Sequence, residues 1–312
     1  MISAIIPTRD RPGELARTLT ELARLGPDDL GEVIVIDNDS EVLPECPRAL
    51  PQGQQVTLIP LDQNLGAAAR NIGAQRARGD WLLMLDDDSH PGSGPLGAAV
   101  QRQPGDVAAV TMDIHLSARG VRESGGLPEV PIGCGVAYRR DAFLGAGGYD
   151  GAFGYYAEEY DLAAKLLLAG LRVAFEPGLR VEHRKVEAGR DMGLILGRLV
   201  RNDGWVLQRY APRDQVDARL REMIERYELI ARKEDALDGY RQGLSELEAT
   251  LDGQRVTTMN ESLWDRFTGL TAARASLRDA HERLGFTSAR VIAPGKHAWA
   301  VERALEELGV VR

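Results

Sequence analysis

The chain has 312 residues, of which 44% are hydrophobic, and a formal net charge of -9. This length and apolar content predict one large domain or two smaller ones with a substantial core. The negative charge argues against nucleic acid as a partner, and Cys46 and Cys134 suggest neither a disulfide framework nor a zinc site.

The N-terminal apolar run ends at Pro7, so it does not predict a signal peptide. No stretch approaches the ~20 consecutive apolar residues that a membrane-spanning helix needs. We therefore expect a cytoplasmic protein without a membrane span, and peripheral contact with a membrane surface stays open.

The first third of the chain alternates between short apolar runs and helical patterns. Helices are predicted at 14–25 and at 64–77, the second with Asn64 near its N-cap. Continuous apolar strands between helices indicate an α/β fold with a mostly parallel sheet, covered on both faces. Strands are predicted at 3–7, 32–37, 56–61, 81–85 and 107–113.

The rest of the chain falls into a glycine-rich part and a helical part. Residues 114–156 read as irregular, before a helix at 157–170 and a strand at 172–177 that Pro177 ends. The segments 213–250 and 271–285 read as amphipathic helices with solvated charged faces. We place a domain boundary before these helices, with one domain at 1–187 and a mainly helical region at 188–312.

Three aspartates, Asp86 to Asp88, directly follow the predicted strand 81–85. Ligands of open α/β sheets bind beyond the carboxyl ends of the strands. In an extended segment, Asp86 and Asp88 face one way and Asp87 the other. Two converging carboxylates suit Mg²⁺ or Mn²⁺ completed by substrate phosphates. A solvated acidic loop is the alternative.

Polar side chains also follow the first two predicted strands. Pro7, Thr8 and Arg9 end the first strand, and Asp37 ends the second. They share the sheet edge of the aspartates, where a carboxylate accepts hydrogen bonds from a nucleobase or a ribose. Arg70 on the next helix offers a guanidinium for phosphate or base, with an ordinary helix-surface role as the alternative.

Five segments together carry a family resemblance. The chain resembles the family 2 glycosyltransferases of the GT-A fold over roughly residues 1–185. This resemblance implies a nucleotide-diphospho-sugar transferase fold with a donor half at about 1–113 and an acceptor half at about 114–187. The segments are IPTRDRP, VIDNDS, NLGAAARNIGAQRARGDWLLMLDDDSHP, GGYDGAFGYYAEEYDLAAKLLLAG and VAFEPGLRVEH.

The resemblance also implies roles for individual residues. The block LDDD resembles the family's DxD motif, which makes Asp88 a metal ligand, with Asp86 and His183 beside it. Asp37 resembles the family's uridine-binding aspartate. The full set of implied donor-binding residues is Pro7, Thr8, Arg9, Asp37, Asn64, Arg70, Asp86 and Asp87.

The segment EEYDL resembles the family's EDxDL, whose second acid is the catalytic base. Here Glu159 stands where the family usually has Asp, so Glu158 and Asp161 are kept as lower-ranked candidates. Acids in the first turn also stabilise a helix through its dipole, and Asp161 with Lys165 forms an i,i+4 pair.

The resemblance implies a metal-dependent inverting glycosyltransferase. It would move a sugar from a UDP- or dTDP-linked donor to a hydroxyl of a glycan, a lipid-linked or a small-molecule acceptor by single displacement, with Mn²⁺ or Mg²⁺ as cofactor. A catalytically degenerate scaffold and a HAD-type phosphatase, suggested by LDDDS, are the alternatives. The helical tail leaves acceptor binding, homo-oligomer formation and membrane-surface contact open.

Overall fold

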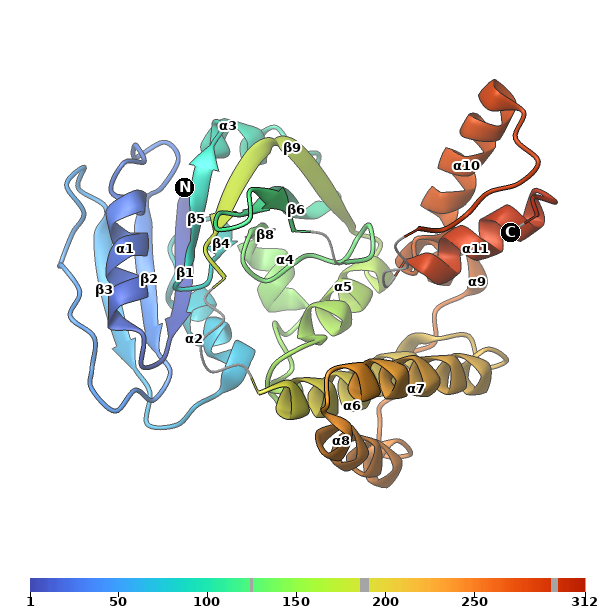
Figure 1. Cartoon of the computed structure of the whole chain (residues 1–312). Helices are drawn as coiled ribbons and strands as arrows, with labels where there is room; N and C mark the ends of the chain where they lie inside the picture. The colour runs from blue at the N-terminus through green and yellow to red at the C-terminus, as the bar shows by residue number, and fades with distance from the viewer. Residues whose placement is uncertain (124–125, 186–190, 293–296, 312) are drawn as a thin grey trace.

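A computed structural model describes residues 1–123, 126–185, 191–292 and 297–311. One curled sheet forms the centre of the α/β part, and helices after it extend away from the sheet (Figure 1). The strand order is β3-β2-β1-β4-β8-β6-β9-β5, with β7 paired to β6.

The first four strands along one side of the sheet pair in parallel. Every position of β1, β2 and β4 is buried, because helices cover both faces. Leucines of α1 pack on one face and alanines of α2 on the other. These elements are β1 (Ile2–Thr8), α1 (Pro12–Leu22), β2 (Glu32–Asp37), β3 (Gln55–Pro60), α2 (Ala69–Arg76) and β4 (Trp81–Met84).

Beyond β4 the sheet is mixed, so the mostly parallel arrangement holds only for the first four strands. β8 runs antiparallel to both β4 and β6, and β9 runs parallel to β6 but antiparallel to β5. The stretch predicted to be irregular contains β8 and α4. The elements are β5 (Ser89–Ser93), α3 (Leu96–Gln101), β6 (Val107–Leu116), β7 (Val121–Arg122), β8 (Val136–Arg139), α4 (Arg140–Gly145), α5 (Glu158–Leu168) and β9 (Arg172–His183).

The prediction that Pro177 ends the last strand is wrong, since β9 continues to His183. The pairing with β6 shifts register there: Met112 faces Glu176, and the next residue, Asp113, faces Arg180. Pro177 therefore lies in a bulge, where the missing N–H costs no ladder hydrogen bond. This bulge lets one strand carry on to His183.

The helix predicted at 64–77 begins later than expected. A 3-10 turn, η1 (Gly66–Ala68), precedes α2, whose first residue is Ala69. The Asn64 side-chain oxygen accepts a hydrogen bond from the N–H of Gly66 at 2.9 Å, before the helix begins. Gly66 has a φ of 61°, and a Cβ there would meet the backbone of Gly154, so the chain must turn before it becomes helical.

Six helices follow the sheet within the described residues. α7, α8 and α10 correspond to the predicted amphipathic segments, whereas α6, α9 and α11 were not predicted. The proposed boundary at 187 falls among residues 186–190, outside the described residues. The helices are α6 (Met192–Tyr210), α7 (Val216–Lys233), α8 (Leu237–Thr250), α9 (Glu261–Phe267), α10 (Leu270–Leu284) and α11 (Ala298–Glu307).

The first of these helices join the α/β part through a common core. Phe153, Ala163 and Leu167 from the segment around α5 are buried in the same cluster as Trp205 of α6 and Trp264 of α9. Among the described helices, none has the length and apolar character needed to cross a lipid bilayer.

Candidate active site

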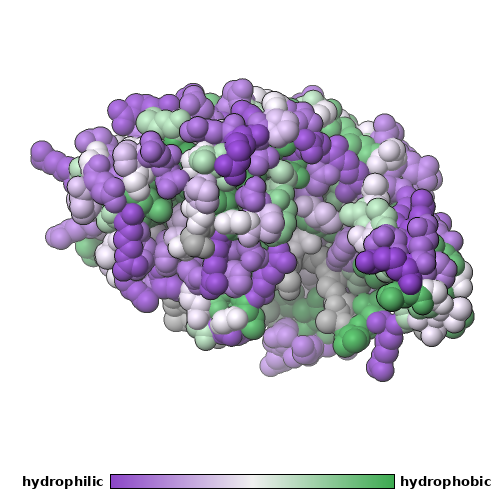
Figure 2. All heavy atoms as spheres, turned by 90° about the horizontal axis from the view of Figure 1, so that it is seen from above, coloured by the Kyte–Doolittle hydropathy of each residue, from purple (hydrophilic) through white to green (hydrophobic). Residues whose placement is uncertain are grey.

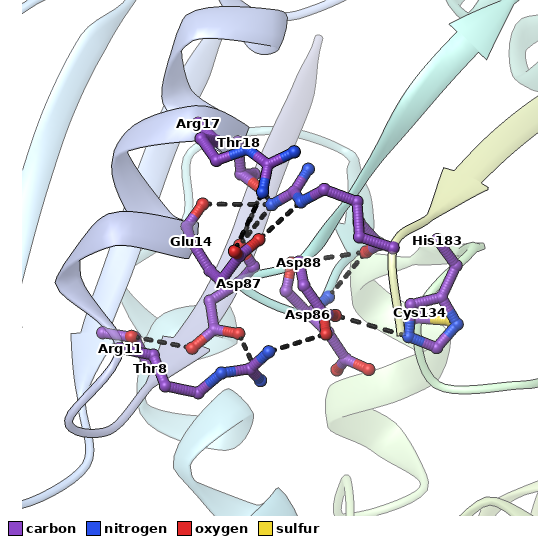
Figure 3. Close-up of polar contacts among 12 residues, drawn as sticks. Thr8, Arg11, Glu14, Arg17, Thr18, Asp86, Asp87, Asp88, Cys134 and His183 are labelled. Atoms are coloured by element: carbon purple, nitrogen blue, oxygen red, sulfur yellow. Dashed lines mark hydrogen bonds and ion pairs between the residues drawn. The ribbon is translucent and has the colours of Figure 1, made fainter. Parts of the chain in front are cut away.

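The three aspartates lie in a turn that follows β4. The Ser89 N–H donates to the Asp86 carbonyl at 3.1 Å, so the segment bends instead of staying extended. Arg11, just before α1, bridges two of the acids: its Nη1 is 2.7 Å from Asp87 Oδ1 and its Nη2 is 2.7 Å from Asp88 Oδ2 (Figure 3). Because Arg11 neutralises charge at this point, the acids can lie side by side.

Asp87 and Asp88 are both buried and meet the same Arg11 guanidinium, so the expected alternation of the two side chains is not seen. The Thr8 hydroxyl donates to Asp87 Oδ2 at 2.9 Å, and Asp87 is buried. Burial raises the pKa of Asp87 to about 7, against the opposing effects of Arg11 and Thr8. For Asp88, burial acts in the same direction, but hydrogen bonds from His183 and Arg11 hold its pKa well below its usual range.

His183, at the end of β9, lies between two carboxylates. Its Nδ1 is 2.7 Å from Glu123 Oε2, and its Nε2 is 3.3 Å from Asp88 Oδ1. Burial would lower the pKa of His183, but hydrogen bonds with Asp88, Cys134 and Glu123 raise it to about 12. A histidine whose second ring nitrogen is held by a carboxylate is the usual arrangement at protein metal sites.

Three side chains bring metal-ligating atoms within 4.8 Å of one another: Asp86, Cys134 and His183. Asp88, the residue predicted as the main metal ligand, is not one of these three, but its Oδ1 contacts His183 Nε2. Carboxylate oxygen and imidazole nitrogen are both ligands that proteins use for divalent cations. The residues present therefore fit a divalent ion.

A cavity of about 300 Å³ opens beside this cluster. It is lined on one side by Asp86 and His183 and on the other by Glu158 and Glu159 of α5, so the metal-ligating cluster and the acids of EEYDL share one space. Its other lining residues include Arg70, Glu123, Cys134, Tyr149, Tyr155, Tyr156, Tyr160 and Lys185.

The backbone before α5 is strained. Tyr156 and Ala157 have φ values of 73° and 66°, a conformation that side chains with a Cβ adopt rarely. Asn202 of α6, which is fully buried, holds the segment: its amide nitrogen lies 3.0 Å from the Phe153 carbonyl and 2.6 Å from the Tyr156 carbonyl. This support aims the first turn of α5 at the cavity.

The two adjacent glutamates have different surroundings. Glu158 is buried, and burial together with the neighbouring Glu159 raises its pKa well above the ordinary value. Asp161 is not among the described residues that line the cavity. It is fully buried and accepts from Arg209 at 2.8 Å and Tyr210 at 2.6 Å, which join α5 to α6.

The remaining predicted donor residues lie at the ends of β1 and β2 or near α2. Asp37 is buried, and its Oδ1 has no hydrogen-bond partner among the described residues. Arg70 is buried and pairs with Asp86. Pro7 is buried within β1, whereas Arg9 is exposed and donates to the Asp39 carbonyl at 3.1 Å.

Comparison with known proteins shows a similarity to one family over part of the chain. Residues 3–127 match the model of the family described as Glycosyl transferase family 2. A glycosyltransferase of Haemophilus influenzae is 29% identical over 197 residues, which are 54% of this chain and 62% of that protein. Residues 3–127 are therefore similar to the family 2 glycosyltransferases. The chain spans about three fifths of the length of this curated relative.

Solved structures agree with the fold of a family 2 glycosyltransferase. TarS 1-349 of S. aureus in complex with UDP-GlcNAc aligns at a TM-score of 0.55 and 16% identity, over 98% of this chain and 91% of that one. A mannosyltransferase from Pyrobaculum calidifontis in complex with GDP-Man and Mn²⁺ aligns at 0.53 and 15%, over 98% and 84%. The fold is GT-A, which argues against the HAD-type phosphatase reading.

Sequence reasoning missed several residues of this site. Arg11 lies in the quoted motif IPTRDRP and was identifiable as a second arginine there. Cys134, Glu123 and Asn202 carry no local signal, since each reaches the site only through the tertiary fold. Tyr155 and Tyr156 also line the cavity, whereas Trp205 is not among its described lining residues.

Proposed function

We propose that the chain transfers a sugar from a nucleotide-sugar to an acceptor hydroxyl by a metal-dependent single displacement that inverts the anomeric centre. One observation carries the proposal: a single cavity holds the metal-ligating side chains and, separately, a glutamate pair at the start of α5. Single displacement needs one group that stabilises the leaving diphosphate and one base, and no nucleophile from the enzyme.

The residues proposed to hold a metal ion beside the leaving diphosphate are Asp86, Asp88, His183 and Cys134. A divalent ion held there would supply Lewis-acid stabilisation to the diphosphate as its charge grows. Arg70 contributes a fixed positive charge at the same place, because it is buried and lines the cavity beside Asp86. The imidazole of His183 favours Mn²⁺ over Mg²⁺ as the ion, because Mg²⁺ is held mainly by oxygen ligands.

A pyrimidine nucleotide is the proposed donor. The unpartnered Oδ1 of Asp37 is an acceptor at the end of β2, and the imide N–H of uracil or thymine is a donor that can satisfy it. Thr8, at the neighbouring end of β1, holds Asp87 and so keeps the aspartate turn next to this nucleotide position. UDP- or dTDP-linked sugars are therefore preferred to GDP-linked ones.

Glu159 is the proposed base, which takes the proton of the acceptor hydroxyl during attack. Burial and the neighbouring Glu159 raise the pKa of Glu158, which disfavours the ionised form that a base needs. Asp161 is occupied by Arg209, Tyr210 and Lys165, and it links helices instead of facing the cavity.

The test measures nucleoside diphosphate release from UDP-, dTDP- and GDP-sugars with Mn²⁺ and with chelator. We expect release that requires the ion and prefers a UDP- or dTDP-sugar. Glu159→Gln should lower turnover by about 10²–10⁴-fold while UDP affinity stays unchanged, because only proton transfer is lost. Glu248→Gln, at an exposed position of α8, is the matched control. Release from no sugar nucleotide would favour the degenerate scaffold instead.

A further inference from the structure

One part of the active-site cavity wall is backbone without a side chain. Hydrophilic side chains dominate the face of the molecule seen from above, with hydrophobic ones beside a hollow (Figure 2). In the wall of the cavity, by contrast, Gly133 lies close to the proposed base, Glu159. Gly133 belongs to the turn before β8 and Glu159 to the first turn of α5, so only the fold brings them together.

The carboxylate of Glu159 fills the space that a side chain at position 133 would need. A Cβ added to Gly133 would lie 3.0 Å from Glu159 Oε1 and 3.9 Å from Glu159 Cδ. The first distance is shorter than an ordinary van der Waals contact of about 3.5 Å. Apart from the chain neighbours of Gly133, no other heavy atom of the described residues lies within 4 Å of that Cβ. The contact is therefore specific to the proposed base.

The backbone does not explain the glycine at this position. Gly133 does not have a positive φ, so alanine could adopt the same backbone conformation without strain. Gly135, two residues later, has a different reason to lack a side chain, since a Cβ there would lie 2.9 Å from Ile114 Cγ1 of β6. Gly135 therefore serves the packing of the sheet, whereas the space at Gly133 is taken by Glu159 alone.

The length of the base determines whether this space is needed. A glutamate carries its carboxylate one methylene group, about 1.5 Å, farther from the backbone than an aspartate does. An aspartate at position 159 would end short of the turn before β8, and a Cβ at position 133 would then meet nothing. The glutamate reaches that turn, so the missing side chain at position 133 and the length of the side chain at position 159 match each other.

We propose that Gly133 is a positioning residue for the sugar transfer, because its missing side chain sets how far the Glu159 carboxylate reaches across the cavity. This inference rests on the proposed function, which takes Glu159 as the base. A base must lie within about 2.6–3.2 Å of the hydroxyl whose proton it accepts. A Cβ that pushes the carboxylate aside disturbs this distance, while the flexible glutamate side chain moves without loss of stability.

The experiment compares Gly133→Ala with the unaltered chain in the release of nucleoside diphosphate from the preferred sugar nucleotide, with Mn²⁺ and with water as the acceptor. We expect kcat to fall by about tenfold, because a displacement below 1 Å already slows a positioned reaction. The KM for the donor and the urea midpoint of unfolding should not change. Gly105→Ala is the matched control, since Gly105 is exposed and an added Cβ has no heavy atom of the described residues within 4 Å.

A double-mutant cycle separates this role from an independent effect of the alanine. Glu159→Asp alone should lower kcat by about 10²-fold, because the carboxylate withdraws from its place. Gly133→Ala should cost nothing further in the Glu159→Asp chain, since the shorter side chain does not reach the new Cβ. An equal loss of kcat from Gly133→Ala in both chains would overturn the proposal, and so would a lowered unfolding midpoint with normal kcat.

Glu159→Gln distinguishes failure of this inference from failure of the proposed function. Normal release by Glu159→Gln would refute the base and the positioning role together. An inactive Glu159→Gln chain with normal release by Gly133→Ala would overturn the positioning role alone. Crystal structures of Gly133→Ala and the unaltered chain test the contact without any turnover. We expect the Glu159 carboxylate to move away from residue 133, and an unmoved carboxylate with a shifted turn before β8 would contradict the proposal.

Discussion

At the scale of single residues, adjacent acids in the site differ through their surroundings and not through their chemistry. Glu158 and Glu159 are neighbours in the first turn of α5, yet Glu158 is buried with Oε2 unpartnered among the described residues. A buried carboxyl beside another carboxyl favours its neutral form, because ionisation would cost both solvation and repulsion. Because Glu158 favours its neutral form, Glu159 is the residue proposed to accept a proton.

The raised pKa of Glu158 predicts how stability depends on pH. Between about pH 4.3, where an unfolded glutamate ionises, and its higher folded pKa, the folded state holds one proton more than the unfolded state. The contribution of Glu158 to the free energy of unfolding is therefore largest at low pH. It falls as pH rises, by up to about 1.4 kcal/mol per pH unit in that window. Glu158→Gln carries no such proton, so its advantage over the unaltered chain should grow toward neutral pH.

Urea unfolding between about pH 5 and pH 8 measures this difference. Glu248→Gln serves as the comparison, because Glu248 is exposed on α8. Parallel stability curves for Glu158→Gln and the unaltered chain would show that Glu158 ionises normally in the folded protein.

The sequence predicted residues that are grouped in the chain and missed those that are not. Asp86 to Asp88 stand out because three charges follow a buried strand, and the structure places Asp86 and Asp88 near His183. Cys134 comes from the loop before β8 and meets His183 only through the register of the sheet. Since strand register depends on distant pairings, no local pattern could identify it.

At the scale of elements, α6 fixes the position of α5. The strained segment at Tyr156 and Ala157 would relax without support, because a left-handed backbone is unfavourable for residues with a Cβ. Asn202 supplies that support through contacts with three carbonyls, those of Phe153, Tyr155 and Tyr156. The helix that the sequence did not predict thus positions the proposed catalytic turn.

Replacement of Asn202 by leucine tests this role. Asn202→Leu keeps a similar volume but leaves the carbonyls of Tyr155 and Tyr156 without this donor, which should cost about 1–3 kcal/mol in stability. The Phe153 carbonyl still accepts from Arg201. We expect turnover to fall by at least about tenfold with an unchanged KM for the donor, because Glu159 moves while the nucleotide site does not. Gln208→Leu, on the same helix, should change neither value. A raised KM with normal turnover would assign Asn202 to donor binding.

The contact between α6 and α8 depends on glycines. A Cβ on Gly243 would lie 2.0 Å from the Gly197 carbonyl oxygen, so the two helices approach closer than any side chain allows. Gly243→Ala should therefore lower the free energy of unfolding by about 1–3 kcal/mol. Gly145→Ala is the control, since a Cβ there has no heavy atom of the described residues within 4 Å. If Gly243→Ala and Gly145→Ala unfolded at the same urea concentration, α6 and α8 would be able to move apart without loss of stability.

At the scale of the whole molecule, the α/β part and the helices α6 to α9 share one core. Amphipathic periodicity predicted that helices follow the sheet, but an apolar stripe does not say which surface it covers. The structure shows that Trp205, Val206 and Tyr210 of α6 pack in the same cluster as Phe153 and Leu167. By contrast, Leu270, Ala273, Ala300 and Ala304 of α10 and α11 form a separate small cluster.

This division predicts opposite results for two truncations. A chain that ends at residue 190 exposes Phe153 and Leu167 and leaves Asp161 buried without Arg209 and Tyr210, so we expect it to aggregate and to lack a cooperative unfolding transition. A chain that ends at Thr268 keeps this core, and it should unfold cooperatively and still bind UDP with Mn²⁺. Size-exclusion chromatography and urea unfolding compare the two. A monomeric, cooperatively unfolding 1–190 fragment would show that the first domain folds alone, as the sequence predicted.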